Sequence, residues 1–192
     1  YKSEDRYKKY KLYTKTREKE AGQTVKMLLA SDSYKGSLTT MQVAEQIKKG
    51  VKKVFPGAEF MCVPVADGGE GTVETMISNL GGEYRTVEVT APDGSRIQAK
   101  YGILKNRIAV IEMAAASGLP IIPKEKRNVM TATTYGTGEL IRAALSEDCD
   151  QIYIGVGGSA TNDGGVGMAQ ALGYSFRDQY GNEVGFGGGE LI

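Results

Sequence analysis

The chain has 192 residues, of which 41% are hydrophobic and 24% are charged, and its formal net charge is +1. This length allows one hydrophobic core or two small ones. No apolar run reaches the roughly 20 residues that a membrane-spanning helix needs. Two cysteines and no histidine exclude the usual zinc ligand sets and Cys–His catalysis. We therefore expect a soluble, cytoplasmic protein without a membrane partner, whose cysteines are ordinary buried thiols.

The charge is concentrated at the N-terminus. Residues 1–26 contain nine Lys or Arg and four Asp or Glu, so the rest of the chain is net acidic. Four tyrosines lie among these charges and would allow stacking on nucleic-acid bases. Because the segment has little apolar periodicity and no initiating Met, we expect instead a disordered or non-native basic tail over 1–26, and no nucleic-acid partner.

After this tail the pattern alternates between strands and helices. The apolar run 27–31 predicts a buried strand. Thr39 and Gln42 then have the spacing of a capping box, which predicts the start of a helix that Pro56 ends. A second strand and a second helix are expected over 60–65 and 71–80. This order is typical of an α/β fold with parallel strands, whose ligands bind beyond the carboxyl ends of the strands.

The middle of the chain has a different pattern. Alternating apolar residues separated by turn signals predict antiparallel hairpins. The strands are expected over 84–90, 96–103 and 107–113. The α/β pattern returns at Thr134, which precedes a helix, and a further strand is expected over 151–156. We therefore expect an α/β protein with a hairpin-rich second part.

The segment 155–167, GVGGSATNDGGVG, is the strongest functional signal. It links an expected strand to an expected helix, where glycines allow close approach and amides point at an anion. Its hydroxyl, amide and carboxylate groups suit phosphate, Mg²⁺ and a hydroxyl nucleophile. The candidate residues are Gly157, Gly158, Ser159, Thr161, Asn162, Asp163, Gly164 and Gly165.

Other polar, glycine-rich segments follow expected strands or open expected helices. Their candidate residues are Asp32, Ser33, Lys35, Ser37, Asp67, Gly68, Gly69, Glu70, Thr72, Ser117, Thr134, Tyr135, Gly136 and Thr137. Each segment alone also fits a plain turn, a helix cap or close helix packing. Together they predict a cleft for a small, hydroxylated, anionic substrate and a nucleotide phosphate. None has the GxxxxGK[ST] phosphate-loop or the dinucleotide-binding pattern, which argues against an oxidoreductase.

Five segments occur in a specific order: DSYKGSL, PVADGGEGT, EMAAASGL, TTYGTGEL and GVGGSATNDGGVGMAQALG. In these segments the chain resembles the bacterial glycerate kinase family, from Lys26 to about Ile192. The resemblance implies ATP-dependent phosphorylation of D-glycerate to 2-phosphoglycerate with Mg²⁺. It also implies a Rossmann-like domain and a second, inserted α/β domain, with the cleft between them.

The chain departs from the family pattern at both ends. Family members begin near Met27 and run to about twice the matched length. We therefore expect residues 27–82 to be the first part of the Rossmann-like domain, and 83–192 to be a truncated inserted domain with its junction. Two other interpretations stay open: a non-catalytic nucleotide- or anion-binding α/β protein, and an inactive kinase fragment.

The roles of three side chains are assigned by residue type. Asp163 or Asp67 would accept the proton of the glycerate hydroxyl, and we favour Asp163 because the polar run beside it can orient a substrate. Asp67 and Glu70 would then hold Mg²⁺, and Lys35 would neutralise the substrate carboxylate or the transferred phosphate. The oligomeric state stays open, with a homodimer among the alternatives.

Overall fold

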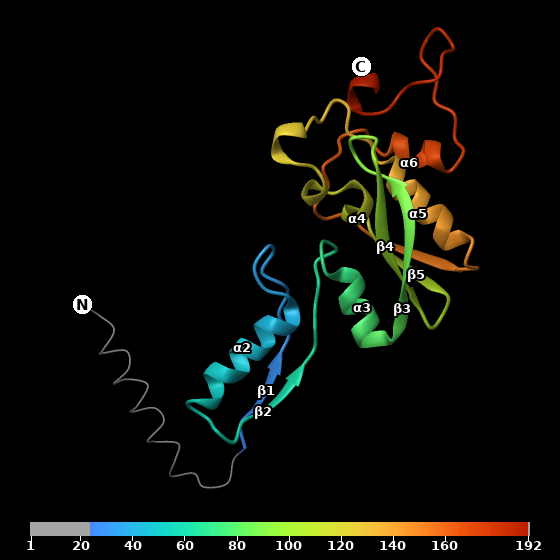
Figure 1. Ribbon diagram of the computed structural model, residues 1–192. Coiled ribbons are helices and arrows are strands. Elements are labelled where there is room, and N and C mark those ends of the chain that lie inside the picture. The colour runs from blue at the N-terminus through green and yellow to red at the C-terminus, as the bar shows by residue number, and fades with distance from the viewer. Residues whose placement is uncertain (1–23, 192) are drawn as a thin grey trace. The chain divides into compact units, whose positions relative to one another are not determined.

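The computed structural model describes residues 24–191 (Figure 1). The expected basic tail therefore lies almost entirely outside the described residues. The chain forms two compact units, Tyr1–Val63 and Pro64–Ile192, and each is described by itself. Within residues 24–191, no helix is long and apolar enough to cross a membrane.

The first unit contains a two-stranded parallel sheet and one helix. β1 (Lys26–Leu29) pairs with β2 (Glu59–Cys62), and α2 (Thr40–Lys52) connects them. The capping box is confirmed: Gln42 N donates to the Thr39 hydroxyl, and Thr39 N donates to the Gln42 side chain. Burial alternates along both strands. One face of the pair carries Leu28 and Met61, which are in register and 63% and 66% exposed.

The second unit is built on a four-stranded sheet in the order β3-β4-β5-β6. β3, β4 and β5 form antiparallel pairs, and β6 pairs with β5 in parallel. The strand bounds are β3 (Gly82–Thr90), β4 (Arg96–Leu104), β5 (Ile108–Glu112) and β6 (Gln151–Gly155). The expected hairpins and the expected strand after them are therefore present, and the protein is mixed α/β with parallel sheet elements.

Helices cover both faces of this sheet. The bounds are α3 (Thr72–Leu80), α4 (Ala114–Ser117), α5 (Tyr135–Leu145) and α6 (Val166–Ala171), with short 3₁₀ turns at Leu119–Ile121, Lys124–Lys126 and Gly188–Leu191. Ile111 packs in the main core with Leu140 of α5. Val110 packs instead with Val73 of α3. Because neighbouring strand residues point to opposite faces, α5 and α3 lie on opposite sides of β5.

The two compact units divide between Val63 and Pro64. The expected Rossmann-like part over residues 27–82 stays a prediction. The reason for the division is the packing of α3, which buries Val73 against Leu104 and Val110 of the second sheet. This helix and the loop before it therefore belong to the second unit.

Candidate functional site

The ends of β5 and β6 bring two of the predicted loops side by side. Glu112 and Gly155 are paired in register, and Met113 N continues the pairing by donating to Gly155 O over 2.9 Å. Beyond the strands, Gly118 and Ser159 form an isolated bridge. The carboxyl ends of parallel strands are the usual ligand edge of an α/β sheet. Segments 113–119 and 155–160 therefore lie together at this edge.

A third predicted loop packs against the glycines of this edge. Gly157 N donates to Gly68 O over 3.0 Å. A Cβ on Gly155 would collide with Gly68 O, and one on Gly157 would lie 2.8 Å from Gly69 Cα. These glycines are thus required for close backbone contact between two loops. Because of this contact, the loop that contains Gly68 and Gly69 covers part of the surface of Gly155 and Gly157.

Acidic and hydroxyl side chains surround Gly68 and Gly69. Gly69 N donates to Asp67 Oδ1 over 2.9 Å, and the Thr72 hydroxyl donates to Gly69 O over 2.7 Å. Asp67 and Glu70 are exposed. Within residues 24–191 there is no group of three or more His, Cys, Asp or Glu side chains arranged to hold a metal ion. The candidate metal ligands are therefore two exposed carboxylates that flank a glycine pair.

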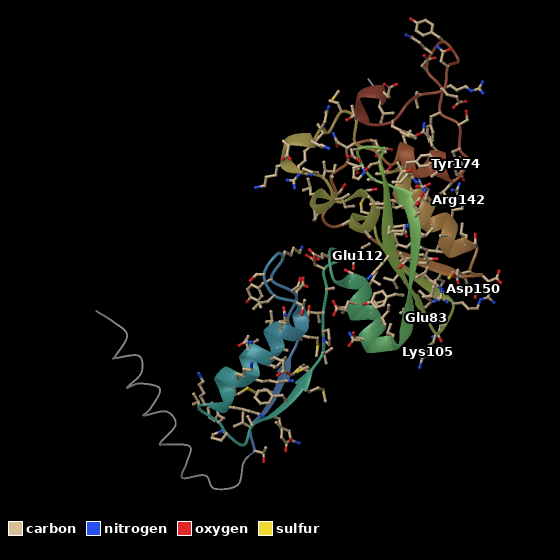
Figure 2. All side chains as sticks on the ribbon, viewed as in Figure 1. Glu83, Lys105, Glu112, Arg142, Asp150 and Tyr174 are labelled. Carbon is tan, nitrogen blue, oxygen red and sulfur yellow. The ribbon has the colours of Figure 1, made fainter. Side chains whose placement is uncertain are left out.

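Glu112 also belongs to this site, although it is not among the candidates from sequence. It lies at the end of β5 beside the start of α3 (Figure 2), and its Oε1 accepts from Val73 N over 2.8 Å. Burial raises the pKa of this carboxyl, and the negative charge of Glu70 raises it further. The sequence indicates this role of Glu112 only indirectly. α3 begins after Gly71, which has no side chain to cap the helix, so the amides of its first turn need an acceptor from another segment.

The predicted hydroxyl loop at the start of α5 meets the end of the glycine-rich loop. Thr134 N donates to Asp163 Oδ2 over 2.8 Å, and the Thr134 hydroxyl donates to the same oxygen over 2.8 Å. Asp163 is 2% exposed. Gly164 and Gly165 have positive φ angles of 60° and 80°, a conformation that glycine adopts without strain. They turn the chain into α6 directly after the buried carboxylate.

Two predicted hydroxyls bond to each other inside the protein. The Ser117 and Thr137 oxygens are 2.8 Å apart, and both residues are buried. Gly136 is buried as well, and a Cβ on it would collide with Thr90 O. These three residues hold the first turn of α5 against α4 and the end of β3. In this structure they therefore have a packing role at the site.

The remaining polar residues of the glycine-rich loop are more accessible. The Ser159 and Thr161 hydroxyl oxygens are 2.9 Å apart, and Thr161 N donates to Ser159 Oγ over 3.1 Å. Asn162 and Gly158 are exposed. This part of the loop is therefore more open to solvent than Asp163.

The C-terminal segment adds residues that the sequence analysis did not select. A Cβ on Gly188 would lie 2.6 Å from Asn162 O, and Gly189 N donates to Met130 O over 2.8 Å. The Phe186 and Tyr135 rings pack with centroids 5.0 Å apart. The run of glycines around Gly188 can be seen in the sequence and could have indicated close backbone packing. The structure places this run beside the glycine-rich loop.

The predicted loop of the first unit has its own geometry. Ser33 N donates to Asp32 Oδ1 over 2.6 Å, and Tyr34 and Leu38 close a small turn by an antiparallel bridge. Lys35 and Ser37 lie on that turn and are exposed. The Ser33 hydroxyl oxygen is buried without a hydrogen-bond partner among the described residues. The structure therefore gives this loop a compact shape within its own unit.

Comparison with known proteins gives consistent matches. The model of the glycerate kinase family matches residues 27–192. Glycerate 2-kinase of Escherichia coli (strain K12) is 54% identical over 168 residues, which cover 87% of this chain and 44% of that protein. Glycerate kinase of Bacillus subtilis (strain 168) is 51% identical over 168 residues, with the same coverage.

A solved structure agrees with these relatives. The crystal structure assigned to glycerate kinase 2 of Salmonella typhimurium LT2 has a TM-score of 0.74 and 49% sequence identity to this chain. The match covers 88% of this chain and 46% of that one. The chain thus spans a little under half the length of the relatives that it matches.

Proposed function

The chain belongs to the glycerate kinase family, and we propose that it provides loops of an ATP-dependent kinase that phosphorylates D-glycerate to 2-phosphoglycerate. One observation carries the proposal. Segments 65–72, 113–119, 133–137 and 155–165, which the sequence singled out separately, converge at the carboxyl ends of β5 and β6. A hydroxylated organic acid and a nucleoside triphosphate are both anions, and both can bind to the backbone amides and hydroxyls gathered there.

Phosphoryl transfer depends mainly on positioning and charge neutralisation. The exposed backbone around Gly158 and the paired hydroxyls of Ser159 and Thr161 suit contacts with phosphate oxygens. We assign Lys35 of the first unit to the negative charge of the substrate carboxylate or the transferred phosphate. Its place on an exposed, closed turn supports this assignment, because a compact ammonium group acts as a point charge on such anions.

The exposed carboxylates of the site divide two roles. Asp67 is exposed and adjoins the Gly68–Gly157 contact, so we assign it to accept the glycerate hydroxyl proton. Glu70 is also exposed, and we assign it to Mg²⁺. Mg²⁺ usually takes one or two protein carboxylates together with substrate phosphates, so Glu70 can hold the ion as a single protein ligand. When bound, Mg²⁺ would neutralise charge on the phosphates of ATP.

The test is a coupled ADP-release assay with D-glycerate. It uses two proteins: this chain, and this chain extended at its C-terminus by the part of its relatives that it does not span. We expect glycerate-dependent ADP release from the extended protein, with 2-phosphoglycerate identified by ³¹P NMR. ATP binding without glycerate-dependent release would indicate a non-catalytic nucleotide-binding protein and contradict the proposal. The shorter chain then shows whether the spanned part is active alone.

A substitution separates the residue assignments from the activity itself. Asp67→Asn in the extended protein is expected to lower kcat by roughly 10²- to 10⁴-fold, the usual effect of removing a general base. Its matched control is Asp93→Asn, which removes a carboxylate from the exposed turn between β3 and β4. Normal kcat in Asp67→Asn would show that another group accepts the proton.

A further inference from the structure

Asp163 is surrounded by hydrogen-bond donors of the protein itself. Its Oδ2 accepts from Thr134 N at 2.8 Å, from Gly167 N at 3.2 Å and from the Thr133 hydroxyl at 3.5 Å. Its Oδ1 accepts from Gly165 N at 3.2 Å, and the Thr134 hydroxyl reaches both oxygens, at 3.0 and 2.8 Å. A carboxylate offers about four lone-pair sites. These donors therefore occupy the side chain, which is 2% exposed.

Thr134 extends this contact to a second helix. Its hydroxyl donates to Asp163 and accepts from Met168 N over 2.9 Å. Thr134 precedes the first residue of α5 but makes no side-chain cap to its own helix. Its hydroxyl is used instead to join the start of α5 to the start of α6. Asp163 and Thr134 thus form one connected unit, which we call the Asp163–Thr134 clamp.

The packing around the clamp leaves little room for movement. A Cβ on Gly167 would collide with the Thr133 hydroxyl and lie 2.8 Å from Asp163 Oδ2. Gly138 allows a similar approach one turn later, where a Cβ would lie 2.7 Å from the Cβ of Ala171. The two helix starts are therefore held at backbone distance, and the clamp sets their register.

The hydrogen-bond partners of Asp163 are neutral groups. None of the ion pairs found among residues 24–191 includes it. Its donors are amides at the starts of α5 and α6 and two threonine hydroxyls. Helix starts carry partial positive charge, and hydrogen bonds to a carboxylate are stronger than neutral ones. Backbone amides and hydroxyls therefore provide the hydrogen-bond partners of this buried side chain.

We propose that Asp163 is a positioning residue, and that the Asp163–Thr134 clamp holds the loops 133–137 and 157–165 in one register for phosphoryl transfer. The proposal rests on the kinase function proposed above. It changes the role that residue type alone favoured, because a proton acceptor must reach the substrate hydroxyl and Asp163 is enclosed. To accept a proton from the substrate, Asp163 would also have to lose hydrogen bonds that hold the starts of α5 and α6 together.

The test compares four substitutions in the extended protein. Thr134→Val removes the hydroxyl at nearly constant shape, and Thr134→Ser keeps it. Asp163→Asn replaces one acceptor oxygen with an amide donor, and Ser146→Ala, at the far end of α5, is the matched control. We expect Thr134→Val and Asp163→Asn to lower kcat/KM by roughly 100-fold each through misplacement of the loops. Thr134→Ser and Ser146→Ala should stay within about threefold.

Two further readouts separate positioning from proton transfer. In the double variant Thr134→Val/Asp163→Asn, kcat/KM should be at most about threefold lower than in Asp163→Asn alone. Residues in one hydrogen-bond network do not act additively. Asp163→Asn should also keep the acidic limb of the kcat/KM pH profile of the parent protein. A different result would make Asp163 the base. In that case Asp163→Asn would lower kcat/KM by more than about 10³-fold and lose the acidic limb, while Thr134→Val would keep a near-normal kcat/KM.

Hydrogen exchange tests the clamp without any activity. In the absence of ligands, the amides of Thr134, Gly167 and Met168 should exchange at least about tenfold faster in Thr134→Val than in Thr134→Ser. Amides of α3 should be unchanged in both. Unchanged exchange at all three positions would overturn the clamp. Absence of glycerate-dependent ADP release from the parent protein would instead contradict the proposed function and leave this readout intact.

Discussion

Glu112 is the residue whose ionisation should be most visible in stability. Burial raises its pKa above the ordinary value of 4.5. The folded state therefore binds a proton that the unfolded state releases, so stability falls as the pH rises from about 4.5 through the folded pKa. Glu112→Gln keeps an oxygen for Val73 N and removes this loss. We expect its urea midpoint to gain on the parent protein as the pH is raised from 4 to about 7.5.

The matched control for this prediction is Glu74→Gln. Glu74 lies in the first turn of the same helix, α3, but is exposed. Its substitution shows what the loss of a carboxylate does at this helix where burial plays no part. If Glu112→Gln and the parent protein lose stability in parallel between these pH values, Glu112 is not a group whose burial penalises its charge.

At the scale of elements, two helical glycines should respond in opposite directions to alanine. A Cβ on Gly138 of α5 would collide with Met168 O of α6, whereas one on Gly50 of α2 would meet nothing within 4 Å. Gly138→Ala should destabilise the protein by about 1–3 kcal/mol through overpacking. Gly50→Ala should stabilise it by about 0.5–1 kcal/mol through helix propensity. Equilibrium denaturation of each variant measures both values, and a Gly138→Ala variant at least as stable as the parent protein would contradict the close α5–α6 packing.

The elements themselves were largely predictable, because their signals are local. The capping box at Thr39 and the alternation along residues 84–90 needed only neighbouring residues, and both elements are present. The site was less predictable because its contacts are distant in sequence. Glu112 caps a helix 39 residues earlier, and Asp163 bonds to Thr134, 29 residues before it. Residue type indicated carboxylate chemistry at Asp163, but burial can be read only from packing.

At the scale of the whole molecule, the two units should differ in local stability. Among residues 24–63, few apolar side chains are buried, namely Val43, Ala44 and Ala58, and they lie beside a two-stranded sheet. Such a pair of strands is marginal alone. The second unit has a larger core around Val89, Ile111 and Leu140. We expect amides of α2 to exchange with solvent faster than those of α5, measured by hydrogen exchange on this chain.

Leu28 and Met61 add to this difference, because they form an exposed apolar pair on β1 and β2. Equal exchange rates in α2 and α5 of this chain would contradict the difference in stability.

The contact between the loops 65–72 and 155–160 has a consequence for sequence variation and for design. Gly155 and Gly157 can have no side chain because Gly68 and Gly69 lie against them. A substitution in one loop could therefore be accommodated only by a backbone shift in the other, and libraries randomised at either loop alone should return mostly glycine at these positions. Libraries that vary Ser159, Thr161 and Asn162 should accept more kinds of side chain, because these residues border the same edge without forming that backbone contact.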